Sequence, residues 1–293
     1  MQKDFEVISD KPENPFLYGF CFLIKRKDFK MSRFCSLFSS SSGNCTFIGT
    51  AKDGILIDAG VSAKRICEAL TARDITPETL RAIFVTHEHS DHTSGIRVLA
   101  SKYNIPVYAT GGTLDGLEMD NILNGKFPCD IIDEGGIDVC GMLVTPFRTP
   151  HDSRESCGYT VMMPDERKIS VATDIGHITD TIISAVSQSD LILIESNHDI
   201  GMLQNGDYPY PLKRRILSDS GHLCNEKCAE AVKKLLEKGT TRFFLGHLSE
   251  HNNIPELAYR TTYAALCEAG AKENVDYTLT VCPKANDKGL IKF

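Results

Sequence analysis

The sequence predicts an α/β protein of the α+β kind, in which two mixed sheets pack face to face between outer helices, a four-layer αββα sandwich. Short apolar runs typical of strands come before and after helical stretches in both halves of the chain. The 293 residues, of which 42% are hydrophobic, are enough for a large core. Apolar strands repeatedly end at a residue that can bind a metal or a proton. The first two observations predict the layers, and the third predicts a site at one edge of the sheets.

In the first half, runs rich in Ile, Phe and Thr are separated by Ser, Gly, Asn or Asp-Gly turns, which is typical of strands. A helix is expected over residues 62–70, with Ser62 as its N-cap, and a second helix over 93–103. The buried strand at 82–85 leads directly into a cluster of histidines. Strands are expected at 34–38, 45–48, 55–57, 82–85 and 107–109.

The second half alternates strands and helices in the same way, and its last third is mainly helical. Helices are expected at 178–187, 212–218, 225–238 and 255–269. Strands are expected at 139–146, 158–163, 169–173, 191–195, 243–245 and 277–282. Residues 31–293 are therefore expected to form one domain.

Residues 1–30 differ from the rest and are predicted to be an N-terminal extension. The apolar run at 15–24 is followed by Lys25-Arg26-Lys27, whereas a secretory signal carries its positive charge before the run. A disordered extension and an upstream start of translation are the two interpretations. No apolar run approaches the roughly 20 residues that a membrane span needs, so no membrane partner is expected.

Charge and cysteine content limit the class of protein. The net charge of −7 argues against a broadly basic surface that coats nucleic acid, but not against a local basic groove. Eleven cysteines without a regular framework predict reduced thiols in a cytoplasmic protein. Cys224 and Cys228 can be small buried hydrophobes or a metal or redox pair, but the second interpretation lacks two further ligands nearby.

Potential ligands follow expected strands at six places. A rigid sheet holds a side chain at a strand end while leaving it in reach of solvent, where a site needs it. Any one of these histidines alone is more often a hydrogen-bonded structural residue than a ligand. The six strand-end residues are Asp58, His87, His151, Asp174, Glu195 and His247.

The strongest signal is the cluster His87, His89, Asp91 and His92 behind the strand at 82–85. Two histidines two apart point the same way if the strand continues, so they can bind one ion. A turn then brings Asp91 and His92 toward a second position. A single ion with all these ligands would have no place for a substrate, so two ions with shared ligands fit better. The helical zinc-protease motif differs, because position 91 is Asp and the segment follows a strand.

The stretch His87-Glu88-His89-Ser90-Asp91-His92 matches an HxHxDH signature, and here the chain resembles the metallo-β-lactamase superfamily, within it the YycJ/WalJ-type branch. The resemblance runs from about residue 31 to the end. It implies the metallo-β-lactamase fold and a hydrolase that cleaves phosphodiester bonds, as a DNA exonuclease acting 5′ to 3′ on duplex DNA. Its further motifs lie at 41–45, 149–152, 173–177, 195–199, 220–223 and 246–249.

The resemblance implies two divalent ions that share one carboxylate. Asp58 matches the family's early Asp, and its implied role is to brace the histidine loop from behind the ligands, because ligand histidines need an acceptor for the second ring nitrogen. Zinc is the expected metal, with manganese and iron as alternatives. The implied ligands are His87, His89 and His151 for the first ion, Asp91, His92 and His247 for the second, and Asp174 for both.

A hydroxide that bridges the two ions is the expected nucleophile, because zinc can lower the pKa of water from about 15.7 to about 7. Asp91 is a catalytic candidate that can orient this hydroxide. His222 is the candidate that protonates the leaving oxygen, and a surface-loop histidine without a role is the alternative. His177 and His198 are weaker candidates.

Two segments are candidates for substrate binding. The polar loop at 39–44 contains Ser42 and Asn44, and its backbone N–H groups can hold a phosphate, unless it is a plain hairpin turn. Lys213-Arg214-Arg215 lies beside Tyr208-Pro209-Tyr210, and basic residues near aromatic ones suit a nucleic-acid backbone and an unstacked base. Arg214 and Arg215 are therefore candidates, and a solvated helix face is the alternative.

The leading prediction is a cytoplasmic metal-dependent nuclease whose partner is nucleic acid, with DNA ahead of RNA. A thioester or ester hydrolase of the glyoxalase II kind would use the same ligands without a basic track. A secreted β-lactamase is disfavoured, since no signal peptide is found and Asp174 stands where those enzymes carry another ligand. A non-hydrolytic nucleic-acid binding or redox protein is the third alternative, which the complete ligand set does not favour.

Overall fold

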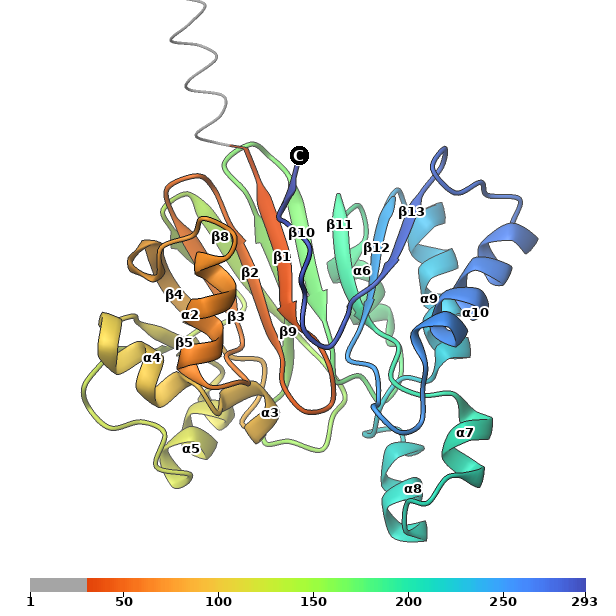
Figure 1. Ribbon diagram of the computed structural model, residues 1–293, viewed down its shortest axis with the longest axis horizontal. Coiled ribbons are helices and arrows are strands. Elements are labelled where there is room, and N and C mark those ends of the chain that lie inside the picture. Colours follow the sequence, from red (N-terminus) through yellow and green to blue (C-terminus); the bar gives the residue numbers. More distant parts are fainter. Residues whose placement is uncertain (1–30) are drawn as a thin grey trace, which may run out of the picture.

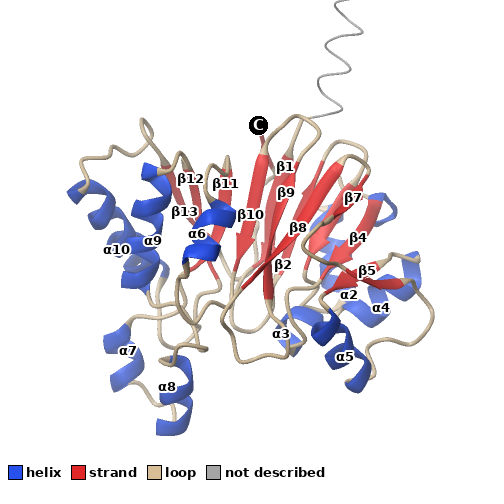
Figure 2. Cartoon of the chain, turned by 180° about the vertical axis from the view of Figure 1, so that it is seen from behind, coloured by secondary structure: helices blue, strands red, loops and turns tan. Residues whose placement is uncertain are grey.

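The computed structural model describes residues 31–293, and the predicted extension over 1–30 lies outside the described residues. Two seven-stranded sheets lie face to face, and helices cover the outer surface of each (Figure 1). The same layers are visible from behind (Figure 2). The predicted αββα sandwich is thereby confirmed. Within 31–293, no helix has the length and apolar character that crossing a membrane requires.

The first sheet has the strand order β14-β1-β2-β3-β4-β5-β6. Strands β3 to β6 run parallel, while β14, β1 and β2 pair antiparallel. The carboxyl ends of β3 and β4 therefore meet at one edge of the sheet. The strands are β1 Arg33–Phe38, β2 Cys45–Gly49, β3 Gly54–Ile57, β4 Leu80–Phe84, β5 Val107–Ala109, β6 Cys129–Ile131 and β14 Ile291–Lys292.

The second sheet repeats this plan in the order β13-β12-β11-β10-β9-β8-β7. Strands β10 to β13 are parallel, and β7, β8 and β9 are antiparallel. The carboxyl ends of β10, β11 and β12 consequently lie side by side. The strands are β7 Ile137–Val139, β8 Met142–Arg148, β9 Cys157–Met162, β10 Lys168–Ala172, β11 Leu191–Glu195, β12 Arg242–Gly246 and β13 Thr278–Val281.

Three apolar clusters fill the spaces between the layers. Ile66 and Leu99 belong to the cluster between the first sheet and its helices, and Val232 belongs to that of the second sheet. Phe84 and Tyr159 lie in the cluster between the sheets. The helices are α2 Ala63–Thr71, η1 Pro77–Thr79, α3 Ser90–Thr93, α4 Ile96–Tyr103, α5 Gly111–Met119, α6 Asp180–Val186, α7 Ile200–Asn205, α8 Tyr210–Ile216, α9 Asn225–Glu237 and α10 Pro255–Glu268.

The core between the sheets also fixes the approach to the histidine cluster. The rings of Phe84 and Tyr159 meet edge to face with centroids 5.6 Å apart, and such pairs contribute about 0.5–1.5 kcal/mol beyond area burial. The Tyr159 hydroxyl donates to the carbonyl oxygen of Val85 at 2.8 Å. Strand β9 therefore anchors the backbone just before His87.

Two expected elements are divided in the structure. The helix expected over 93–103 is α3 followed by α4, with a break at Gly95, where a Cβ would lie only 2.2 Å from the Val61 carbonyl oxygen. The strand expected over 139–146 is the hairpin of β7 and β8, turned at Cys140 and Gly141 with φ of 56° and 82°. The short elements β6, β14, α5 and α7 were not expected.

The cysteines of the described residues are all free. Cys224 and Cys228 are buried, at 8% and 0% exposure, and Cys224 is the N-cap of α9. Neither belongs to a group that can hold a metal among residues 31–293. Their environment fits the interpretation as small buried hydrophobes.

Candidate metal centre

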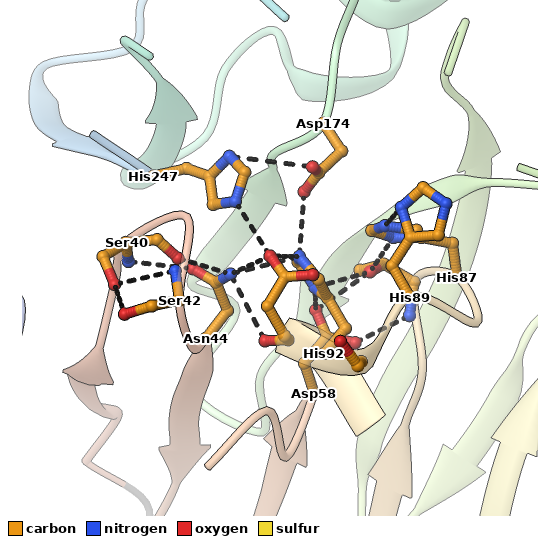
Figure 3. Close-up of polar contacts among 12 residues, drawn as sticks. Ser40, Ser42, Asn44, Asp58, His87, His89, His92, Asp174 and His247 are labelled. Atoms are coloured by element: carbon orange, nitrogen blue, oxygen red, sulfur yellow. Dashed lines mark hydrogen bonds and ion pairs between the residues drawn. The ribbon is translucent and has the colours of Figure 1, made fainter. Parts of the chain in front are cut away.

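The seven predicted ligands lie together at the edge where the carboxyl ends of both sheets meet. Figure 3 shows His87, His89, His92, Asp174 and His247 of this set. They come from the segments that follow β4, β8, β10 and β12. In each group the potential ligand atoms lie within 4.8 Å of one another. The groups that contain only predicted ligands are His87–His89–His151, Asp91–His92–His247 and His87–His92–Asp174.

The histidine cluster takes its shape from a tight turn and a very short helix. His89 is the N-cap of α3, and the next four residues turn Asp91 and His92 back toward the centre. The backbone after Asp58 packs directly against this turn, because Gly60 has no side chain. A Cβ there would lie 1.6 Å from the Asp91 carbonyl oxygen. Gly60 therefore permits the close approach that holds the ligand loop.

Asp58 holds the histidine cluster from the first sheet. It has φ of 62° at the end of β3 and is 3% exposed. Its Oδ2 lies 2.7 Å from His92 Nδ1, and it accepts hydrogen bonds from Thr86 N at 2.8 Å and Thr86 Oγ1 at 2.9 Å. His92 Nε2 is left to face Asp174, whose Oδ2 lies 3.2 Å away. This is the geometry that the predicted bracing role requires.

Glu195 holds the histidines of the second sheet, a role that the sequence did not reveal. Its Oε1 lies 2.8 Å from His222 Nδ1 and 2.7 Å from His247 Nδ1. Its Oε2 accepts from Ile175 N at 2.7 Å and Leu223 N at 3.1 Å. Glu195 also forms a possible ligand group with Asp174, His222 and His247, but four N–H donors already occupy its two oxygens. We therefore interpret it as a brace for the two histidines.

Asp174 lies between the groups. It has φ of 57° and is 2% exposed. Its Oδ1 lies 3.6 Å from His247 Nδ1 and 3.7 Å from His151 Nε2. Its Oδ2 is buried and faces His92 Nε2 at 3.2 Å without a hydrogen bond, because the hydrogen of the neutral His92 ring lies on Nδ1, toward Asp58. A buried carboxylate oxygen without a donor is costly, and a cation at this position removes that cost.

The charges of the centre favour divalent cations. Burial opposes ionisation of Asp174, but His247 and His92 hold its pKa well below the usual value. Burial likewise opposes the charge on His247, yet Asp174, Asp91 and Glu195 raise its pKa to about 10. The carboxylates thus demand positive charge, which metal ions supply in place of protons. Burial lowers the pKa of His87, which keeps that imidazole neutral with a lone pair available for an ion.

His222 lies beside these residues and is 17% exposed at its side chain. Its ring centroid lies 5.0 Å from that of His151 and 5.4 Å from that of His247. Burial disfavours its protonation, but the adjacent Glu195 carboxylate raises its pKa above the usual value. Since Glu195 occupies Nδ1, the second ring nitrogen, Nε2, is available to a substrate.

A cleft of about 470 Å³ opens over the centre, and Asp91, Asp174 and His222 contribute to its lining. Its other wall comes from the segment of α7 and α8, which projects beyond the strand ends (Figure 1). Tyr208 and Leu212 of this segment line the cleft. The cleft therefore combines potential metal ligands with an aromatic and an apolar side chain.

The three basic residues on α8 have different environments. Lys213 Nζ donates to the carbonyl oxygens of Gln204 at 2.9 Å and Gly206 at 2.6 Å, which ties α8 to the end of α7. Arg215 lines the cleft and forms a two-pronged ion pair with Asp152. Arg214 is exposed and has no ion pair among residues 31–293. Of the predicted pair, Arg214 thus has the free guanidinium.

The polar loop at 39–44 does not form the predicted backbone cradle. Each N–H of residues 39–44 already has an acceptor within the protein, so none is left for a phosphate. Asn44 is buried, and its Nδ2 lies 3.1 Å from His92 Nε2 and 3.4 Å from Asp91 Oδ2. Asn44 therefore contacts two of the predicted ligands. Ser42 is exposed, and a substrate contact from its hydroxyl stays a prediction.

The remaining histidines lie outside the ligand groups. His177 is exposed, and its Nδ1 lies 2.8 Å from the Asp219 carbonyl oxygen. His198 is buried at 1% exposure. His251 is exposed and packs edge to face against Tyr208 with centroids 5.8 Å apart. Among residues 31–293, none of these three histidines has a hydrogen bond to a predicted ligand, whereas Glu195 contacts His247.

Known proteins similar in sequence to this chain belong to one superfamily. The beta-lactamase superfamily domain matches residues 54–248 of the chain. The exodeoxyribonuclease WalJ of Streptococcus pneumoniae is 39% identical over 249 residues, which cover 84% of this chain and 92% of that protein. The exodeoxyribonuclease YycJ of Bacillus anthracis is 38% identical over 241 residues, with coverage of 81% and 90%.

Solved structures of low sequence identity share the fold. The metallo-beta-lactamase fold protein YhfI from Bacillus subtilis has a TM-score of 0.68 at 12% identity, and the match covers 90% of this chain and 100% of that one. Zn(2+)-bound PqqB from Methylobacterium extorquens has a TM-score of 0.64 at 16% identity, with coverage of 89% and 100%. These likenesses extend over both sheets and not only over the histidine cluster.

Proposed function

The chain belongs to the beta-lactamase superfamily, in the company of the WalJ and YycJ exodeoxyribonucleases, and on that premise we propose that it is a metal-dependent exodeoxyribonuclease. The observation that carries the proposal is the convergence of seven potential ligands, Asp174 among them, beside His222, which pairs with Glu195 and lines the open cleft. The proposed substrate is duplex DNA, shortened from its 5′ end in the cytoplasm, where the free cysteines stay reduced.

We propose the ligand assignment that the family resemblance implied. The donor chemistry, neutral imidazoles together with carboxylates, suits zinc first and manganese or iron as alternatives. When bound, the two cations lower the pKa of a water molecule and offset the charge of the reacting phosphate. His87, His89 and His151 would hold one ion, Asp91, His92 and His247 the other, and Asp174 both.

The protein's own groups then act on the proton and the leaving oxygen. Asp91 is partly exposed in the cleft, and burial is outweighed by His92 and His247, which keep its pKa low. It is therefore an acceptor that can orient the attacking water. His222 gives its proton from Nε2 to the leaving 3′-oxygen as the phosphorus–oxygen bond breaks and the water oxygen joins phosphorus. Glu195 keeps the His222 ring in position and favours its protonated form.

The α7–α8 segment is the proposed contact to nucleic acid. Arg214 offers a free positive charge to the phosphate backbone, and Tyr208 offers a ring at the cleft. A thioester hydrolase does not require a basic and aromatic segment beside its metal centre. A non-hydrolytic protein does not require a complete set of metal ligands. Neither alternative is favoured by the names of the relatives.

The test uses protein stripped of metal and reloaded separately with zinc and manganese. Duplex DNA labelled at either the 5′ or the 3′ end is then added, and product length is followed over time. We expect stepwise shortening from the 5′ end that requires metal and is absent in Asp174→Ala. Protein that holds two ions but cleaves no DNA would contradict the proposal.

A further inference from the structure

A second cavity, of about 410 Å³, shares His222 with the cleft over the candidate metal centre but includes none of the seven predicted ligands. It lies between the loop after Asp174, the segment that follows α8 and one face of α9 that reaches from Lys227 to Lys234. His222 therefore stands where the two spaces meet. His222 is thus placed to contact groups bound in either space.

A buried histidine without a partner lines this cavity. His198 is 1% exposed, and its Nε2 has no hydrogen bond among the described residues. Its Nδ1 lies 3.4 Å from Asn197 Oδ1, while the amide nitrogen of Asn197 donates to the His247 carbonyl oxygen at 2.9 Å. Nδ1 thus carries the hydrogen, and burial lowers the pKa of His198 to about 4. Nε2 is a bare acceptor that a ligand hydroxyl or amino group would satisfy.

The cavity wall also carries positive charge on α9. Lys227 and Lys234 are seven residues apart and so share one face of the helix. Glu230 offsets Lys227 through an ion pair at 2.9 Å, and the wall further includes the acid Asp219. Lys234 is exposed and has no ion pair within residues 31–293. It is the cation available to an anionic ligand.

We propose that this cavity binds the 5′-terminal nucleotide of the strand being cut, with its 3′-oxygen beside His222, a sugar or base donor at His198 and its 5′-phosphate at Lys234. The inference rests on the proposed nuclease function. A cavity of this volume holds a small molecule, and it has no room for a continuing duplex. Cleavage is thereby restricted to strand ends, which distinguishes an exonuclease from an endonuclease.

The products are consistent with this placement. The bond between phosphorus and the 3′-oxygen breaks, the water oxygen joins phosphorus, and the proton of His222 passes to the 3′-oxygen. A nucleotide with a 5′-phosphate and a 3′-hydroxyl is left in the cavity, and the shortened strand carries a new 5′-phosphate. That end has the phosphate which the next cycle requires, so 5′-phosphorylated ends are the preferred substrate.

The test compares Lys234→Glu with Lys233→Glu in the metal-loaded full chain. Lys233 is the exposed neighbour on α9, outside the cavity wall, and its reversal changes net charge equally. Binding of deoxyadenosine 5′-monophosphate is measured by calorimetry, and KM is measured for duplexes with a 5′-phosphate or a 5′-hydroxyl. We expect Lys234→Glu to weaken nucleotide binding about tenfold or more and to remove the preference for the 5′-phosphate. Lys233→Glu should behave as the wild type.

Equal effects of the two reversals, or no nucleotide binding by the wild type, would overturn the subsite. The nucleotide is bound without turnover, so this result is independent of cleavage. DNA shortening at equal rates from both kinds of end, without nucleotide binding, would reject the subsite and leave the nuclease in place. Nucleotide binding that needs Lys234, in a protein that cleaves no DNA, would instead reject the nuclease.

Discussion

Asp58 and Glu195 are buried carboxylates at strand ends of opposite sheets, and each holds histidines of the same centre differently. Asp58, after β3, holds His92 and the Thr86 segment, so its contacts stay within the histidine loop. Glu195, at the end of β11, holds both His247 and His222 through one oxygen. The first sheet thus braces a predicted ligand alone, whereas the second couples a predicted ligand to the proposed proton donor.

The two carboxylates therefore affect metal binding and proton donation to different extents. Loss of the Asp58 contact should weaken metal binding and leave the proton donor in place. Loss of the Glu195 contact should weaken metal binding and also disturb turnover by metal-loaded protein. Measuring metal affinity and kcat in one variant of Asp58 and one variant of Glu195 therefore tests this difference.

The largest effect is expected where the two halves join. Asp174→Ala removes the carboxylate that approaches His92 from one sheet and His247 from the other. We expect loss of both ions and of all measurable cleavage, because neither half keeps its shared ligand. Metal content by mass spectrometry and a cleavage assay check this. Full activity at full metal content would contradict the proposed bridging role.

The next effect isolates the proton donor. In His222→Ala, the predicted ligands and the Glu195 contact to His247 remain. We expect metal content to be unchanged and kcat to fall about 10²-fold to 10⁴-fold, as for the loss of a general acid. Single-turnover cleavage at saturating metal gives the value. An unchanged rate would remove His222 from the mechanism.

The direct comparison pairs Glu195→Gln with Asp58→Asn, since each keeps the shape of the side chain and removes its charge. Both should lower metal affinity, by about 10-fold to 100-fold, as outer partners of metal ligands do. Only Glu195→Gln should also lower kcat at saturating metal, because the amide holds His222 less firmly and no longer favours its protonation. Metal titration and kcat are measured for both variants. Equal kcat values would abolish the distinction between the two braces.

The smallest effect lies outside both braces, on α8. Arg214→Glu should weaken DNA binding and reduce the slope of log affinity against log salt by about one, the change expected for one phosphate contact. Arg215 already pairs with Asp152 and is the poorer site for this test. Lys233→Glu is the matched control for charge. A salt slope equal to that of the control would make α8 a bystander.

The sequence predicted the two halves of the centre unequally. The first half is contiguous: the HxHxDH stretch and the early Asp58 were visible in the order of residues, and β3 and β4 are neighbours. The second half is dispersed over the ends of β10, β11 and β12, and only the order of strands shows that Glu195 lies between Asp174 and His247. The spacing of residues along the chain does not show the order of strands in a sheet.

Elements with strong patterns were predicted well, and those shaped by close contact were not. Helix α9 and strand β11 stand where periodicity placed them. The break at Gly95 depends on the carbonyl of Val61, which is distant in sequence, so local pattern could not show it. The loop at 39–44 is polar like many anion sites, but its N–H groups have internal acceptors that only the fold supplies.

The central claim is that each of the two ion sites takes ligands from both sheets and that Asp174 joins the two sites. Anomalous diffraction from crystals of the zinc-loaded protein tests it most directly. We expect two metal peaks, one among His87, His89 and His151 and one among Asp91, His92 and His247, both next to Asp174. A single peak, or a peak coordinated by Glu195, would contradict the account.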